Sequence, residues 1–144
     1  MLDAFEQATA ARRPRRLTWD VGARDVPQAI GRLRIAAKRL QLPYAVSGLA
    51  GASFVRRVVE PAAVDVWIGR DVPEQWAQEL MAVPSRPGPG RITACLAPDP
   101  FVLSLASRHQ SVQVADPVQL YLDCRRAGER ALEAADAIRT EMSW

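Results

Sequence analysis

The sequence predicts an α+β domain in which a mixed central sheet of four or five strands is covered by helices. Short apolar runs, alternating or continuous, recur along the chain and are typical of strands. Longer stretches with apolar residues three and four positions apart lie between them and indicate amphipathic helices. The chain has 144 residues with 49% hydrophobic content, which suits one compact domain with one core.

Composition limits the location and the chemistry of the protein. No apolar run approaches the ~18 to 20 residues that spanning a bilayer requires, and residues 1–16 lack the apolar centre of a signal peptide. We therefore expect a cytoplasmic protein without a membrane role. Cys95 and Cys124 form no ligand pattern with the single histidine, His109, so we expect buried thiols and neither a disulfide nor a zinc site. No Ser or Cys nucleophile motif accompanies His109.

The first third of the chain predicts two helices and a strand. Residues 2–11 suit a short helix, and residues 16–21 alternate weakly, as an edge strand does. A second helix begins at Asp25, with Pro27 in the first turn and Gln28 at the capping-box position. Its apolar stripe comprises Ile30, Leu33, Ala37 and Leu40.

The middle of the chain predicts a strand, a helix and a second strand. Residues 44–46 suit a buried strand, and Ser47 and Gly48 a turn before a helix over residues 49–57. The small residues of this helix favour close packing against a sheet or another helix. Residues 62–68 alternate, with one strongly apolar face, and predict the next strand.

A helix that starts at Asp71 and a proline-rich loop should follow. Asp71 is expected to cap this helix because Glu74 stands three residues later. Its expected buried stripe comprises Trp76, Leu80 and Val83. Residues 84–90 read PSRPGPG, which holds neither a helix nor an inner strand and predicts a loop.

The last third predicts two strands and two helices. Residues 92–96 and 110–114 suit strands, whereas residues 101–105 fit a strand or a short helical turn equally. Asp116 is expected to cap a helix because a proline follows it directly and Gln119 stands three residues later. A final helix has the apolar stripe Leu132, Ala135, Ile138 and Met142.

Residues 44–68 resemble the opening strand, helix and strand of a nucleotidyltransferase. Such enzymes hold divalent metal with two carboxylates at alternate positions of the second strand, where side chains point to the same face. Here those positions are Asp65 and Trp67. One carboxylate beside an indole cannot form that clamp, so we expect a nucleotidyltransferase-like topology without catalytic residues, metal or cofactor, and a chain that is not an enzyme.

Asp65, Asp123 and the four tryptophans can each be explained by a structural role, without catalysis or ligand binding. Asp65 is expected to bond to nearby backbone or to pair with Arg56 or Arg57. Asp123 can form a helix-surface ion pair with Arg126 or Arg130. The four tryptophans do not interleave with basic residues, so we expect core or interface packing.

The basic residues gather in the first 42 positions, which carry nine Lys and Arg against four Asp and Glu. Clustered cations attract phosphate or an acidic partner, with an affinity that salt weakens. Solvation of a helix face and a loop is the alternative explanation. The candidate surface for nucleic acid or a partner comprises Arg12, Arg13, Arg15, Arg16, Arg32, Arg34, Lys38 and Arg39.

Three landmarks together resemble the C-terminal domain of the AbiEi-type antitoxins, the transcription regulators of type IV toxin–antitoxin systems. They are LDAF near the start, YAVSGLAGASF at 44–54 and VADPVQLYLDCRRAGERALEAADAIR at 114–139. The resemblance covers nearly the whole chain and implies one domain over residues 1–144. The N-terminal winged-helix domain that family members typically carry is absent from this sequence, so we expect no operator recognition by a helix-turn-helix.

The resemblance implies an antitoxin or regulator domain with a functional link to a nucleotidyltransferase-type toxin. A DNA or acidic protein partner and a homodimer are the expected associations. Two alternatives stay open. One is a minimal metal-dependent nucleotidyltransferase that uses Asp65 with a distant acid such as Asp99 or Asp123. The other is a protein–protein interaction domain whose arginines only solvate it.

Overall fold

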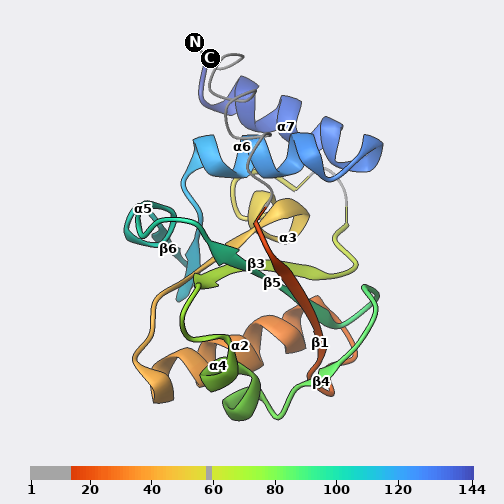
Figure 1. The fold of residues 1–144 in the computed structure, drawn as a ribbon. Coiled ribbons are helices and arrows are strands. Elements are labelled where there is room, and N and C mark those ends of the chain that lie inside the picture. The colour runs from red at the N-terminus through yellow and green to blue at the C-terminus, as the bar shows by residue number, and fades with distance from the viewer. Residues whose placement is uncertain (1–13, 58–59) are drawn as a thin grey trace.

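A computed structural model describes residues 14–57 and 60–144, which form a mixed sheet between two helical layers (Figure 1). The α+β prediction is confirmed. The strands in the described part of the chain are β1 (Arg16–Asp20), β2 (Tyr44–Ser47), β3 (Val64–Gly69), β4 (Val83–Pro84), β5 (Arg91–Ala97), β6 (Ser107–His109) and β7 (Val112–Val114). The helices there are α2 (Val26–Leu40), α3 (Gly48–Ala52), α4 (Pro73–Leu80), α5 (Phe101–Ser104), α6 (Pro117–Arg126) and α7 (Glu129–Glu141). The helix predicted over residues 2–11 lies outside the described residues.

The sheet has the order β4-β1-β5-β3-β2-β7-β6. Strands β3 and β5 run parallel at its centre, as do β2 and β7, whereas β1 and β5, and β2 and β3, pair antiparallel. The described strands number seven, not four or five, because β4 and β6 are only two and three residues long and were not predicted. Such short strands leave almost no period-two pattern in a sequence. β4 pairs outside β1, so the prediction that β1 forms the edge is wrong.

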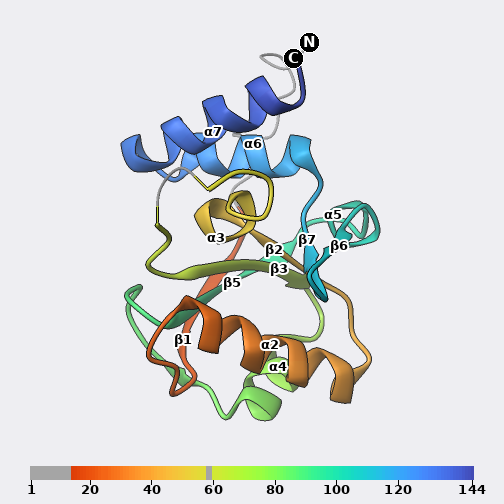
Figure 2. The ribbon, with the colours of Figure 1, turned by 180° about the vertical axis from the view of Figure 1, so that it is seen from behind.

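Each face of the sheet carries its own helices (Figures 1 and 2). Helices α2 and α4 pack together on one face, and α3, α6 and α7 form the layer on the other. Trp19 and Trp76 are buried in the core, and Trp67 is 4% exposed, so the predicted packing role of these three indoles is confirmed. Trp144 is 41% exposed and packs edge-on against Tyr121.

The two strongest helix-start predictions are confirmed. The Asp25 carboxylate accepts the backbone N–H of Gln28 at 2.9 Å, and α2 begins at the next residue. Asp116 accepts from the N–H groups of Val118 and Gln119 and begins α6 in the same way. Both caps use groups within three residues, which is why the sequence alone is sufficient to find them.

Two predictions about where helices begin or end are wrong. α3 stops at Ala52 because the N–H groups of Phe54 and Val55 bond to carbonyls three residues back, which tightens the last turn. The Asp71 side chain makes no cap, because α4 starts two residues later at Pro73, whose fixed φ suits the first helical position.

Val83 and Leu132 are exposed rather than buried. Met81 adopts a left-handed conformation with φ of 52°, which ends α4 and places Val83 in β4. α7 packs through Ala131, Ala134, Ala135 and Ile138, which turns Leu132 outward to 39% exposure. The ambiguous residues 101–105 contain the short helix α5.

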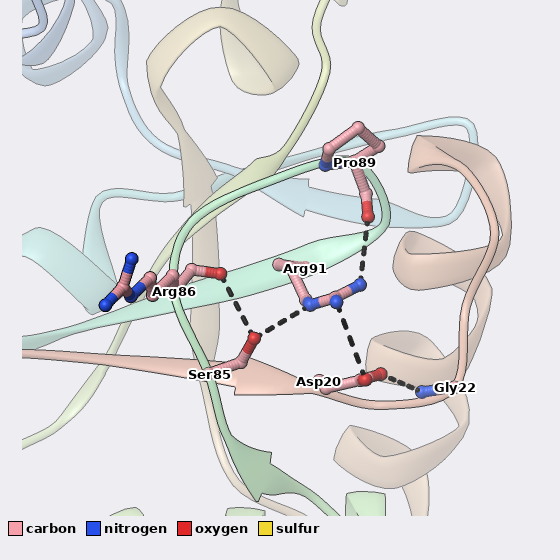
Figure 3. Close-up of polar contacts among 6 residues, drawn as sticks. All are labelled: Asp20, Gly22, Ser85, Arg86, Pro89 and Arg91. Carbon is pink, nitrogen blue, oxygen red and sulfur yellow. Dashed lines mark hydrogen bonds and ion pairs between the residues drawn. The ribbon is translucent and has the colours of Figure 1, made fainter.

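The loop that follows β4 is tied to the sheet by Arg91 (Figure 3). Its Nε donates to Ser85 Oγ at 2.9 Å, and its Nη1 donates to the Pro89 carbonyl. Its Nη2 lies 3.7 Å from Asp20 Oδ2. These contacts hold residues 85–90 as the predicted loop against the end of β1.

Cys95 and Cys124 are buried free thiols, as predicted. No helix in the described ranges is long and apolar enough to cross a membrane.

Candidate functional site

A row of polar side chains crosses the sheet at the level where β2 ends. The register aligns Ser47 with Asp65, Asp65 with Thr93, and Thr93 with Thr18. Residues in register on neighbouring strands point to the same face. The hydroxyls of Thr18 and Thr93 confirm this by a 3.1 Å hydrogen bond. The adjacent row on the same face contains Trp67, Cys95 and Arg16.

Asp123 of α6 closes this polar layer from above. Its Oδ2 accepts hydrogen bonds from Ser47 Oγ at 2.5 Å and from Trp67 Nε1 at 2.7 Å. Its Oδ1 accepts a hydrogen bond from Gln119 Nε2 at 2.9 Å. The predicted surface ion pair is therefore wrong, because this side of α6 faces the sheet rather than solvent. The bonds to Ser47 and Trp67 link α6 to the end of β2 and to the middle of β3.

The surroundings of the layer raise the pKa of both of its carboxyl groups. Burial raises the pKa of Asp123, while the hydrogen bonds from Ser47, Trp67 and Gln119 act in the opposite direction. Burial likewise raises the pKa of Asp65, with Arg16 opposing the shift and Asp123 adding to it. The pKa of Cys95 rises to about 12, mainly through burial, so this thiol stays protonated.

Asp65 has no hydrogen-bond or ion-pair partner in residues 14–57 and 60–144. The predicted pairing with Arg56 or Arg57 is wrong, because Arg57 pairs instead with Glu60 at 2.8 Å. Gly48, with φ of +62°, lies so close to the Asp65 carboxylate that a Cβ there would collide with Oδ2. The carboxylate therefore lies against the backbone at the start of α3.

β3 does not present two carboxylates to a metal ion, because Trp67 stands two residues after Asp65, where the second acid would be. The Trp67 indole N–H instead donates a hydrogen bond to Asp123. No group of three or more His, Cys, Asp or Glu side chains in the described residues could hold a metal ion. The structure nevertheless supplies what the β3 pattern lacked, a second carboxylate in the same layer, from Asp123. Asp99, the other acid considered, caps Phe101 N–H at the start of α5 and is no part of this layer.

The candidate basic residues fall in two places. Arg12 and Arg13 lie outside the described residues. Arg15 and Arg16 are exposed where β1 begins, and Arg16 acts electrostatically on Asp65. The cations of α2 lie on the face of the sheet opposite to α6 and Asp65, so the structure does not bring the six described residues of the set into one surface.

The basic residues of α2 are all exposed, and they differ in their partners. Arg39 pairs with Glu79 of α4 at 3.3 Å, and Arg32 donates to the Gly22 carbonyl. Arg32 and Arg39 also line a groove of about 580 Å³ between α2, α4 and β4. Arg34 and Lys38 have no carboxylate partner in the described part of the chain.

Asp123 and Arg126 are the residues of this site that sequence reasoning misjudged. Both belong to a polar stripe with Gln119, spaced four and three residues apart on α6. Such a stripe normally marks a solvated face. The signal that could have revealed burial is the apolar character of the rest of α6, whose Leu120, Tyr121, Leu122 and Cys124 are all buried.

Comparisons with known proteins bear on the fold. No model of a protein family matches the sequence, and no curated protein matches it. A solved structure of the aminoglycoside nucleotidyltransferase ANT(2″)-Ia in complex with adenylyl-2″-tobramycin superposes on it with a TM-score of 0.50. The likeness covers 81% of this chain and 99% of that chain at 10% sequence identity. The chain has a nucleotidyltransferase-like fold. At this identity the likeness extends to the fold alone.

This finding corrects the prediction that the chain is not an enzyme. The solved structure that shares the fold belongs to an active aminoglycoside nucleotidyltransferase. The prediction rested on the missing acid of β3, but Asp123 brings a carboxylate to the same layer from α6. The replacement of one strand acid by Trp67 is therefore no ground for excluding catalysis.

Proposed function

We propose that the chain is a nucleotidyltransferase-fold domain of an AbiEi-type antitoxin and transcription regulator, and that it binds nucleic acid through α2. The proposal is supported by one observation in particular: Arg32, Arg34 and Lys38 are exposed without a carboxylate partner among the described residues. At a rise of about 1.5 Å per residue they fall within ~9 Å along the helix. That span is close to one Debye length at physiological salt, so each cation acts on phosphate largely on its own, and lower salt strengthens their combined attraction.

Reversal of these three charges is expected to abolish the salt-dependent part of DNA binding. If each cation neutralises one phosphate, the affinity of the wild-type protein should fall about 40-fold between 50 and 200 mM salt. The triple variant R32E/R34E/K38E should bind weakly at both concentrations. Fluorescence anisotropy with a labelled duplex from the gene's own promoter measures both affinities.

The matched control reverses three exposed arginines on other elements, in the variant R108E/R130E/R139E. It changes the net charge by the same amount, so equal loss of binding in both variants would contradict a specific role for α2. If the affinity for DNA does not depend on salt and the chain still binds a protein, its partner is an acidic protein and not DNA.

The antitoxin role has its own test. Co-expression of this chain with a nucleotidyltransferase-type toxin encoded beside its gene should restore growth, and no recovery of growth would refute the role.

Metal-dependent nucleotidyl transfer is a second candidate, favoured by the presence of Asp65 and Asp123 in one polar layer. Asp123 already accepts three hydrogen bonds, so Asp65 is the carboxylate left free to act on a ligand. The wild-type chain should then transfer the nucleotidyl group of a nucleoside triphosphate to water or to an added hydroxyl acceptor in the presence of Mg²⁺, with release of pyrophosphate, and Asp65→Asn should reduce the rate at least ~100-fold. Asp71→Asn, at an exposed carboxylate beside α4, is the control. No pyrophosphate from the wild-type chain, or equal rates in both variants, would exclude this candidate.

A further inference from the structure

Arg126 presents two buried N–H donors that nothing in the described chain accepts. Its Nε and Nη2 are enclosed and have no hydrogen-bond partner. Buried polar groups are almost always bonded, and an orphaned one in a native fold calls for an explanation. A charged group in this position is more costly than a neutral one.

The two orphaned atoms form one functional edge of the guanidinium. The N–H bonds of Nε and Nη2 run side by side, and this fork matches two oxygens of a single carboxylate or phosphate. The third nitrogen, Nη1, is not among these enclosed atoms, and the Arg126 residue as a whole is half-buried.

No acid of the described chain is placed to fill this fork. Asp123 is three residues away and acts on Arg126 electrostatically, but both of its oxygens already accept hydrogen bonds. The acids at the start of α7, Glu129 and Glu133, are exposed. The missing partner is therefore a group that no described residue supplies.

We propose that the Nε/Nη2 edge of Arg126 binds one oxyanion, a phosphate or carboxylate group of a small ligand, beside the polar layer. Asp123 fixes α6 to Ser47 and Trp67, and this holds Arg126 in place before a ligand arrives. The site is independent of nucleic-acid binding by α2, because α2 covers the other face of the sheet.

Titration of the intact chain with sodium phosphate, sodium acetate and ATP tests the proposal by calorimetry. At least one probe should bind, and Arg126→Lys, which keeps the charge but loses the fork, should weaken that binding at least ~10-fold. Arg130→Lys on α7, an exposed arginine nearby in sequence, should bind as the wild type does. Binding of phosphate, acetate or only ATP distinguishes a free phosphate, a carboxylate and a nucleotide as the source of the oxyanion.

A second measurement keeps the test valid if the lysine variant does not fold. In the ¹⁵N spectrum of the wild-type chain, the Arg126 Nε–H signal should shift on addition of the bound probe. No binding of any probe, equal binding to Arg126→Lys, or an unmoved Nε–H signal would each overturn the proposal. Loss of the Arg126 site with intact DNA binding would leave the proposed function of α2 untouched.

Discussion

Asp123→Ala is expected to lower the free energy of unfolding by about 3 kcal/mol, measured by urea denaturation at neutral pH. The carboxylate is the common acceptor for donors on β2, β3 and α6. Alanine removes that acceptor and leaves the indole N–H of Trp67 enclosed, since this side chain is only 4% exposed. Each orphaned buried donor costs about 1 to 3 kcal/mol.

Asp123→Asn is the conservative control and should cost about 1 kcal/mol. The asparagine oxygen can still accept from Ser47 and Trp67. The Gln119 amide can turn so that its oxygen accepts from the new NH₂ group. Asp136→Ala removes an exposed carboxylate of α7 and should change stability by less than about 0.5 kcal/mol. Similar losses in the alanine and asparagine variants would mean that the hydrogen bonds of Asp123 do not stabilise the fold.

The contrast between Asp116 and Asp123 explains what could be predicted from the sequence. Asp116 caps α6 through N–H groups two and three residues ahead, and a local pattern therefore identifies it. Asp123 bonds to Ser47 and Trp67, which are 76 and 56 positions away. Only the strand order of the sheet brings these residues together, and no local pattern contains that order.

The same distinction separates the predicted strands from the missed ones. β3 and β5 are long enough to show apolar character, and the sequence predicts their ends to within two residues. β6 has three residues, two of them exposed, and exists because it pairs with β7 across a turn with positive φ at Gln110 and Ser111. Burial by neighbouring strands, rather than intrinsic preference, decides such short elements.

Gly51→Ala is expected to destabilise the chain by about 3 kcal/mol, although alanine favours helices more than glycine does. A Cβ at Gly51 would lie 2.7 Å from Leu120 Cδ2 and 2.7 Å from the carbonyl oxygen of Val46. The leucine can turn aside, but the β2 carbonyl is fixed backbone. α3 would then have to move away from the sheet, and α6, which packs on α3, would move with it.

Gly31→Ala is the matched control, because the same methyl group enters a helix where nothing lies within 4 Å. It should stabilise the chain by about 0.5 to 1 kcal/mol through the loss of backbone freedom in the unfolded state. If urea denaturation shows that Gly51→Ala lowers the free energy of unfolding and Gly31→Ala raises it, the loss at Gly51 comes from packing and not from helix propensity.

The displacement of α6 in Gly51→Ala has a second consequence, at the polar layer. Asp123 would withdraw from Trp67, so the indole N–H would exchange its carboxylate partner for water. Trp67 emission, followed with the other tryptophans replaced by phenylalanine, should then shift to longer wavelength in Gly51→Ala and stay unchanged in Gly31→Ala. If Gly51→Ala loses stability but its Trp67 emission does not shift, then α3 moves alone and α6 is held in place by its own hydrogen bonds to the sheet. In that case Asp123, rather than the packing of α3 against α6, fixes the distance between this helical layer and the sheet.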